Sequence, residues 1–370
     1  MSGTLKQVFL NNYHKEKKAK FFPFAGYSMP INYDQGIIKE HLHVRTSVGI
    51  FDVSHMGQIL ILISDLNIMN LEKYIPLNLK TLKNNKSYYS FIINTQGGVI
   101  DDIILSKITY QNKKYLFIVY NSSRKKEDEK IFRGNLSNFI YLKDNSLIAI
   151  QGPLAEEIIH FLPGAKELTF MYSLVINYLK HSIIITRSGY TGEDGFEISV
   201  PNSIALNFIK QLMKNTNAKL CGLGARDSLR LEAGLCLYGH ELNESITPIE
   251  ANLNWAIHKE RLNDNNLNGN KILLNQIKNG TNKYKIAIKS LSKSILRTNM
   301  KLIDDTKIQI GHITSGAFSP TTKSSIAIGY INKKLEVGEK IYTSIRNITE
   351  ELKIVKLPFV LHNYKKGLYK

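Results

Sequence analysis

The chain has very little cysteine, and this scarcity excludes several kinds of site. Its 370 residues include two cysteines, Cys221 and Cys236, which are too few for a disulfide framework and wrongly spaced for a zinc knuckle or a redox pair. His41 and His43 lack a convincing third ligand, so the sequence predicts no metal site. We expect each cysteine to be buried as a small apolar residue.

Long apolar runs are also absent. No segment approaches the roughly 20 apolar residues of a membrane span. The start of the chain, from Met1 to Lys6, lacks the apolar core of a secretory signal. We therefore expect a cytoplasmic protein with no membrane partner, or a protein of the mitochondrial matrix if the chain is eukaryotic.

The short motifs of many nucleotide-binding and hydrolase sites are missing as well. The chain has no Gly-Lys-Ser/Thr phosphate loop and no Gly-x-Ser-x-Gly elbow. Gly222 and Gly224 lack the third glycine and the preceding strand that a dinucleotide fingerprint requires. The functional hypothesis therefore rests on acidic side chains and an arginine acting together.

Positive charge, by contrast, is in excess. The formal net charge is +18, from 49 Lys and Arg residues against 31 Asp and Glu residues. Such an excess suits nucleic acid, an acidic protein partner or an anionic small molecule. The basic residues are mostly scattered lysines, and no dense basic block is interleaved with aromatic residues as a nucleic-acid surface requires. We therefore favour lysine-rich composition over a nucleic-acid partner.

The length and the patterning predict an α+β protein of two or three domains. Strand and helix units recur with antiparallel hairpins, as in the pair of strands expected at 99–108 and 114–121. A helix is expected over residues 34–47, with Asp34 as its N-cap. From about residue 284 to residue 360 the pattern changes to short strands and turns, which indicates a small β-barrel or sandwich.

Two adjacent carboxylates follow a Gly-Gly turn in the stretch from Asn94 to Asp102, and they enter an expected strand. Because strand faces alternate, Asp102 shares a face with Ile100 and Ile104, while Asp101 points to the opposite side. Apolar surroundings disfavour the charged form of a carboxylate, so an ionised acid there needs a cationic or hydrogen-bonding partner. Acids at functional sites are often tuned in this way. The alternative is a solvated hairpin mouth in which both acids contact water.

A second acid and an arginine stand out further along the chain. After a glycine-rich loop, Phe196 and Ile198 share one face of an expected strand, which leaves Glu197 on the other face. Arg226 lies in an expected helix that ends at Gly234, and it has no evident partner at helical spacing. A surface position remains the alternative for Arg226.

Several motifs, in this order and across essentially the whole chain, resemble the T-protein of the glycine cleavage system. The motifs are Phe24-Ala25-Gly26, the run from Phe51 to Met56, Gly97 to Asp102, Gly189 to Gly195, Ala225 to Gly239, Leu357 to Val360, and Asn363-Tyr364.

The resemblance implies a three-domain cloverleaf with folate in its central hole. Residues 1–275 would form the folate-binding region from two interleaved α+β subdomains, and residues 284–370 would form a C-terminal β-barrel domain. The implied activity is an aminomethyltransferase. It passes the methylene carbon of the aminomethyl group on the dihydrolipoyl arm of the H-protein to tetrahydrofolate, with release of ammonia and formation of 5,10-methylenetetrahydrofolate.

The same resemblance assigns site residues. Asp102 matches the catalytic acid beside the reacting folate nitrogens, although the sequence alone does not choose it over Asp101. Glu197 matches the carboxylate that holds the N–H donors of the pterin. The remaining positions expected to contact folate or to line its pocket are Arg226, Tyr364, Asn121, Met56, Tyr89, Tyr238 and Asp101.

Three other functions compete with this interpretation. A folate-binding relative of the same fold serves iron–sulfur assembly, but it carries a Lys-Gly-Cys-Tyr-x-Gly-Gln-Glu segment, which the run from Gly234 to Glu241 does not match. Demethylases that pass a methyl group to tetrahydrofolate share the architecture, but they are not expected to keep the acid pair in this context. A nucleic-acid-binding protein would rest on net charge alone. We assign no role to His240.

Overall fold

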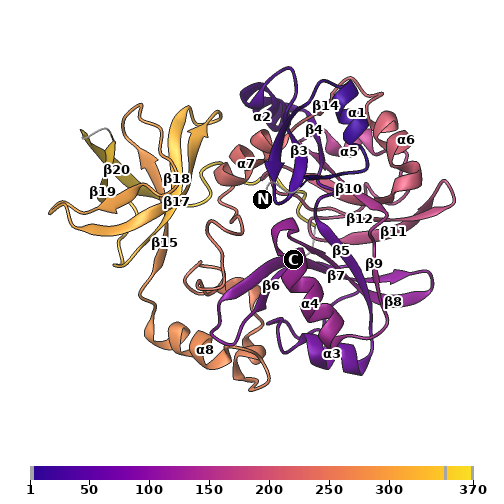
Figure 1. The fold of residues 1–370 in the computed structure, drawn as a ribbon, viewed down its shortest axis with the longest axis horizontal. Helices are drawn as coiled ribbons and strands as arrows, with labels where there is room; N and C mark the ends of the chain where they lie inside the picture. The colour runs from indigo at the N-terminus through magenta and orange to yellow at the C-terminus, as the bar shows by residue number, and fades with distance from the viewer. Residues whose placement is uncertain (1–3, 346–347, 368–370) are drawn as a thin grey trace.

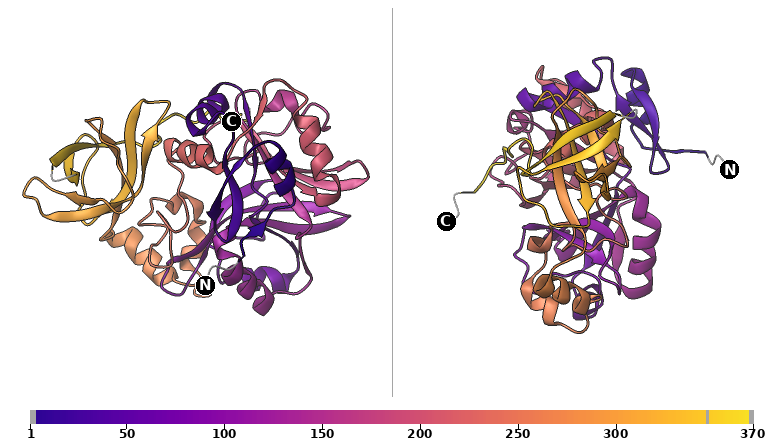
Figure 2. Two further views of the ribbon diagram at one scale, coloured as in Figure 1. Left: turned by 45° about the horizontal axis from the view of Figure 1, so that its top comes forward. Right: turned by 90° about the vertical axis from the view of Figure 1, so that its left-hand side faces the viewer.

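The structure, a computed structural model, describes residues 4–345 and 348–367. Three lobes lie around a common centre: two lobes built on β-sheets, and a barrel at the left of Figure 1. The left view of Figure 2 shows the barrel beside the two sheet lobes rather than stacked on either one. The α+β fold with a C-terminal barrel that the sequence predicts is confirmed.

The first lobe is a six-stranded sheet with helices on both faces. Its order is β11 (Ser173–Tyr178), β12 (His181–Thr186), β13 (Gly195–Pro201), β10 (Asn145–Gln151), β4 (Val48–Asp52) and β14 (Ala218–Leu220). One face packs on α1 (Asn11–Glu16), α5 (Ala155–Ile158) and α6 (Asn202–Leu212). The other face packs Phe51 and Leu147 against α2 (Ile37–Thr46) and α7 (Leu223–Glu232).

The second lobe is a five-stranded sheet. Its order is β6 (Ser87–Ile93), β7 (Val99–Tyr110), β8 (Lys113–Tyr120), β5 (Gly57–Leu62) and β9 (Phe139–Tyr141). One face packs on α3 (Asp65–Leu71) and α4 (Lys125–Asn135). On the opposite face Leu60 and Phe117 pack against Ile184 of β12, so the two sheet lobes share a core.

Two smaller parts complete the region before the barrel. A three-stranded sheet consists of β1 (Lys6–Gln7), β3 (Tyr27–Asn32) and β2 (Lys20–Phe24). After α7 the chain forms η2 (Asn254–Ala256), η3 (Lys259–Asn263) and α8 (Asn270–Asn279), and η1 (Ser122–Arg124) precedes α4. The segment after α7 packs Leu242 and Leu253 on Phe91 and Val99 of the second sheet.

The barrel is closed by six strands. Their order is β15 (Tyr284–Ser290), β18 (Ser324–Ile331), β17 (Gln309–Ser319), β16 (Lys301–Ile303), β19 (Lys340–Ile345) and β20 (Ile348–Val355). The chain then leaves the barrel and returns to the first lobe, where the amide of Asn363 donates to the Gly192 carbonyl at 2.8 Å. The division into residues 1–275 and 284–370 stays a prediction, and residues 368–370 lie outside the described part of the chain.

The helix predicted over residues 34–47 begins later than expected. It starts at Ile37, and its N-cap is Gly36 with a φ of 78°, so the prediction of Asp34 as the cap is wrong. The reason is a turn in which the Gly36 amide donates to the Tyr33 carbonyl at 2.9 Å. A positive φ at this turn suits glycine, and the helix therefore begins directly after Gly36.

The turn that leads into β7 is held tightly in place. Asn94 Oδ1 accepts hydrogen bonds from the backbone amides of Gln96 and Gly98, both at 2.9 Å. A Cβ atom on Gly98 would lie 1.8 Å from the carbonyl oxygen of Glu244. The turn and the segment after α7 therefore fit together only without a side chain at position 98.

We expect Gly98→Ala to lower the free energy of unfolding by more than about 2 kcal/mol, because backbone must shift to relieve the clash. The measurement is thermal or urea unfolding. Gly134→Ala in α4 is the control, since a Cβ there meets no atom within 4 Å. The control should gain up to about 1 kcal/mol from helix propensity. Equal stability of the two variants would contradict the tight fit of this turn.

Candidate active site

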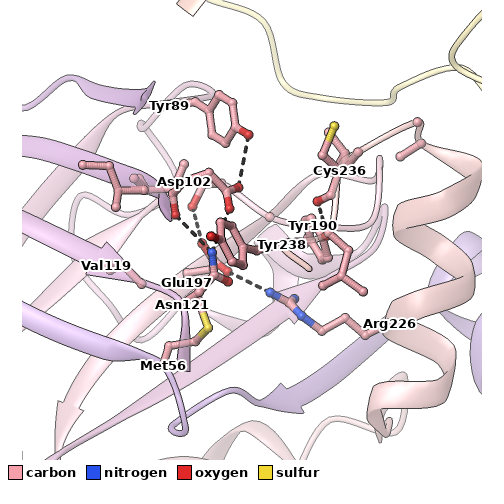
Figure 3. A pocket seen from close by; sticks show the side chains of 18 of the residues that line it. Met56, Tyr89, Asp102, Val119, Asn121, Tyr190, Glu197, Arg226, Cys236 and Tyr238 are labelled. Atoms are coloured by element: carbon pink, nitrogen blue, oxygen red, sulfur yellow. Dashed lines mark hydrogen bonds and ion pairs between the residues drawn. The ribbon is translucent and has the colours of Figure 1, made fainter. Parts of the chain in front are cut away.

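A cavity of about 1200 Å³ lies where the three lobes meet. Its lining comes from segments far apart in the chain, including Phe24 of β2, Tyr89 of β6, Asp102 of β7, Glu197 of β13, Arg226 of α7, Lys285 of β15 and Tyr364 of the C-terminal segment. This volume accommodates a ligand larger than a typical drug, since ligand pockets span about 300–1,000 Å³. Figure 3 shows the polar side chains that converge on it.

Asp102 presents its carboxylate to the cavity from β7. Its Oδ2 accepts a hydrogen bond from the Tyr89 hydroxyl at 3.1 Å, and its Oδ1 accepts one from Asn121 Nδ2 at 2.8 Å. Burial raises the pKa of Asp102 to about 6, although these two hydrogen bonds oppose the rise. Such a group exchanges a proton near neutral pH, which is the property that a general acid or base needs.

Asp101 points to the side of β7 opposite Asp102, as predicted. Its Oδ2 and Oδ1 accept hydrogen bonds from the backbone amide and from Nδ2 of Asn121, both at 2.8 Å. The side chain of Asp101 is fully buried, so the alternative of a solvated hairpin mouth in which both acids contact water is wrong. Asp101 is not among the residues that line the cavity. The prediction that it lines the ligand pocket is therefore wrong, and Asp101 instead lies behind the wall, where it holds Asn121.

The expectation that Ile100 shares the Asp102 face is also wrong. The reason is that the pairing of β6 and β7 shifts register between Ile92 and Ile93. Ile100 packs against the cluster that contains Ile103.

Glu197 enters the cavity from the first lobe. It pairs with Ala149 across β13 and β10, and this register turns it toward the face that packs on α2 and α7. Its Oε2 accepts a hydrogen bond from the Ser188 hydroxyl at 2.9 Å, and its Oε1 lies 3.7 Å from Arg226 Nη2. One oxygen therefore retains acceptor capacity toward the cavity.

Arg226 and five aromatic side chains form much of the remaining wall. The Arg226 guanidinium lies 4.9 Å from the centre of the Tyr190 ring. The Tyr89 ring stacks on Trp255 with 5.7 Å between ring centres and an angle of 25° between planes. Tyr364 stacks on Phe170 at 3.9 Å. Flat surfaces of this kind suit a planar ring system.

The structure brings eight of the nine predicted site residues to one cavity. They are Met56, Tyr89, Asp102, Asn121, Glu197, Arg226, Tyr238 and Tyr364. The placement is a finding, whereas the role of each residue stays a prediction.

The sequence reasoning missed several residues that also line the cavity. Trp255 had a usable signal, because it is the only tryptophan in the chain. Tyr190 lies in the glycine-rich loop that was identified, and its hydroxyl donates to the Cys236 carbonyl. Lys285 gave no signal, yet its Nζ lies 3.3 Å from Cys236 Sγ. The cysteines are buried as expected, but Cys236 also reaches the cavity.

Within residues 4–345 and 348–367, no group of three or more His, Cys, Asp or Glu side chains is arranged to hold a metal ion. No helix in these ranges is long and apolar enough to cross a membrane.

Two family profiles match this chain. The profile described as the GCVT N-terminal domain matches residues 10–261. The profile described as the glycine cleavage T-protein C-terminal barrel domain matches residues 285–360. Together they cover both sheet lobes and the barrel.

Curated relatives match over almost the whole chain. An aminomethyltransferase of Dictyostelium discoideum is 39% identical over 99% of this chain and 95% of its own length. The aminomethyltransferase of Saccharomyces cerevisiae is 38% identical, with coverage of 99% and 97%. The enzyme of Pisum sativum is 37% identical, with coverage of 98% and 91%. All three are named as mitochondrial proteins.

A solved structure agrees with these matches. The crystal structure of the glycine cleavage system aminomethyltransferase T from Bartonella henselae superposes with a TM-score of 0.91 at 35% sequence identity. The superposition covers 98% of this chain and 100% of the other. The arrangement of lobes around the cavity is therefore shared with that enzyme.

Proposed function

Since this chain belongs to the glycine cleavage T-protein family and is an aminomethyltransferase, we propose that its central cavity binds tetrahydrofolate as the acceptor of the transferred carbon. One observation carries the proposal: Asp102 and Glu197, from two different sheets, face one cavity with flat aromatic walls. Two carboxylates that face one site suit a ligand that presents N–H donors and then develops positive charge.

Glu197 is the proposed acceptor for the amino and ring N–H groups of the pterin. A carboxylate can accept two parallel hydrogen bonds from such a donor pair. Ser188 and Arg226 contact this carboxylate from the side and so orient it. Tyr89, Tyr238 and Met56 would provide apolar walls for the ring system, and Arg226 and Tyr364 would contact the folate or its carboxylate-bearing tail.

Asp102 is the proposed catalytic acid. As the bond between the transferred carbon and the lipoyl sulfur breaks, the carbon becomes part of an iminium-like cation, and a nearby carboxylate stabilises that charge. Because the pKa of Asp102 is raised to about 6, the same group can also accept or return a proton at the folate nitrogens. The site thus combines electrostatic stabilisation with proton transfer.

The lipoylated H-protein is the proposed donor partner. Its aminomethyl group is carried on a sulfur of the dihydrolipoyl arm. The carbon becomes a bridge between N5 and N10 of tetrahydrofolate, which together lose two protons. One proton leaves with the amino group as ammonia, and the other goes to the sulfur, which becomes a free thiol. The reacting thiol belongs to the partner. Cys236 of this chain is not an activated thiolate, because burial raises its pKa.

The function is tested by incubating the chain with aminomethyl-loaded H-protein and tetrahydrofolate while ammonia is measured. We expect ammonia and 5,10-methylenetetrahydrofolate to form in equal amounts. Reactions without folate, or with H-protein that lacks the lipoyl arm, are the controls. Release of ammonia at the same rate without folate would contradict the role of folate as the acceptor.

The excess positive charge suggests how partner and ligand approach. We propose that part of the +18 net charge attracts an acidic H-protein surface and part attracts the folate polyglutamate tail. We therefore expect the Michaelis constant for H-protein to rise with ionic strength, because salt screens such steering. If the Michaelis constant for H-protein did not change across a salt series, the positive charge would have no role in binding H-protein and would reflect the lysine-rich composition alone.

The curated relatives carry mitochondrial names. They support a location in the mitochondrial matrix if this chain is eukaryotic, and the cytoplasm is the proposed location otherwise.

A further inference from the structure

A third buried acid lies behind the catalytic wall. Asp128 belongs to α4, which packs on β7, and its exposed fraction is 0%, as is that of Asp101. Asp128 lies close enough to Asp101 for the charge of Asp101 to act on the Asp128 carboxyl group. Asp102 follows on the cavity side of the same strand, so three acids form a row from the core to the cavity.

The row has no close cation to neutralise it. Among the described residues, no Lys, Arg or His nitrogen forms an ion pair within 4.0 Å of any of the three acids. Arg124 is the cation that faces Asp128, but its side chain donates to the Ile100 carbonyl at 2.8 Å and to Glu244 at 2.5 Å.

The other titratable groups near Asp128 do not help it to ionise. They are Glu127 of α4 and the hydroxyls of Tyr120 and Tyr238. Two adjacent carboxylates in such a place repel each other and lose solvation, so the pair must hold a proton.

The hydrogen bonds decide which acid of the pair holds the proton. Burial and the charge of Asp102 raise the pKa of Asp101 to about 7, and the hydrogen bonds that both of its oxygens accept from Asn121 oppose this rise and favour its ionised form. Neither oxygen of Asp128 accepts a hydrogen bond from any donor in the described residues. Burial, and then the negative charge of Asp101, raise the pKa of Asp128 far above its ordinary value.

We propose that Asp128 is a neutral carboxylic acid whose O–H donates to Asp101, and that it acts as a positioning residue for the catalytic wall. This inference rests on the proposed function, because it concerns the way in which Asp102 and Asn121 are held. Asp128 itself touches neither the cavity nor the ligand.

The consequence reaches the cavity through Asn121. Its Nδ2 donates to Asp101 Oδ1 and to Asp102 Oδ1, both at 2.8 Å. Ionised carboxylates only accept hydrogen bonds, so the amide nitrogen must face them and the amide oxygen is left for the ligand. An ionised Asp101, kept so by the proton on Asp128, therefore fixes both the position and the orientation of the Asn121 amide.

Two substitutions at Asp128 separate the effect of its hydrogen-bond donor from the effect of its side-chain volume. Asp128→Asn keeps a neutral donor beside Asp101, so we expect turnover within about threefold of the parent chain. Asp128→Leu removes the donor, and Asp101 must then take up the proton itself. We expect Asp128→Leu to lower turnover at least about tenfold, because displaced catalytic groups lose rate steeply.

The pH profile gives a readout that a purely structural role would not move. In Asp128→Leu a neutral Asp101 no longer repels the charge on Asp102, so the pKa of Asp102 falls. The acid limb of the turnover profile should move to lower pH in Asp128→Leu and stay in place in Asp128→Asn. Asp305→Asn, at an exposed position in the barrel lobe, is the control that should change neither property.

Infrared spectroscopy tests the proton without any activity. At an alkaline pH, above the pKa values of Asp101 and Asp102, the parent chain should still show the C=O band of a protonated carboxylic acid, and Asp128→Asn should lose it. This result does not depend on folate or H-protein, so it stands even if the proposed function fails. Absence of the band from the parent chain would overturn the proposal, as would Asp128→Asn being as impaired as Asp128→Leu.

Discussion

Replacing Asp102 with Asn is expected to lower turnover by about 10³-fold, the loss typical of a group that stabilises transition-state charge. The affinity for reduced folate should change by less than about tenfold, since neutral hydrogen bonds can replace part of the contact. Asparagine keeps the shape of the side chain, but it carries no charge and takes up no proton. The measurements are single-turnover ammonia release and equilibrium folate binding.

The same substitution should stabilise the fold. The pKa of Asp102 rises from an ordinary value of 3.8 to about 6 in the folded chain. The folded state therefore binds this proton more tightly than the unfolded state does. The free energy of unfolding falls as pH rises through that window and stays lower above it. Asp102→Asn removes this cost, so we expect a gain of up to about 3 kcal/mol at pH 7.5.

The two effects together separate catalysis from folding. The melting temperature of Asp102→Asn should rise by a few degrees at pH 7.5, and the gain should disappear toward pH 4. Asp305→Asn, at an exposed position, should leave both turnover and stability unchanged. Near-normal turnover in Asp102→Asn would remove this acid from the reaction, and a loss of folate binding equal to the loss of turnover would assign it to binding.

Replacing Glu197 with Gln is expected to weaken folate binding by about 100-fold, equivalent to about 3 kcal/mol. An amide offers one acceptor oxygen, and its NH2 group faces the donors of the pterin, so one charge-assisted hydrogen bond is lost and one donor stays unpaired. Turnover at saturating folate should fall far less. Glu197 would thus differ from Asp102 in the step that it supports.

Folate affinity can be followed through Trp255, the only tryptophan of the chain, which stacks on Tyr89 in the cavity. Its fluorescence should change on titration with reduced folate, with calorimetry as a second method. Glu157→Gln, at an exposed position, is the matched control and should bind folate normally. An unchanged dissociation constant for Glu197→Gln would place the pterin elsewhere.

Local pattern predicted much of the geometry. The alternation of β7 placed Asp101 and Asp102 on opposite faces, and the same rule turned Glu197 away from Phe196. Alternation cannot say which face meets a cavity, so the choice of Asp102 over Asp101 came from resemblance to the family. The lining of the cavity by Asp102, and not by Asp101, agrees with that choice.

Long-range packing explains what the sequence did not reveal. Helix α4 has the charged run Lys125 to Lys130, which is typical of a solvated face, yet Asp128 within it is fully buried against β7. Trp255 lies in a segment without periodic signal, and it reaches the cavity because the chain after α7 packs on the second sheet. Such placements depend on contacts between lobes, which no local window contains.

A crystal structure of the chain with bound tetrahydrofolate tests the central claim most directly. We expect the pterin amino and ring N–H groups at the Glu197 carboxylate, and N5 and N10 beside the Asp102 carboxylate, within the cavity shared by the three lobes. A folate molecule bound outside this cavity, or bound within it without contact to either acid, would contradict the account.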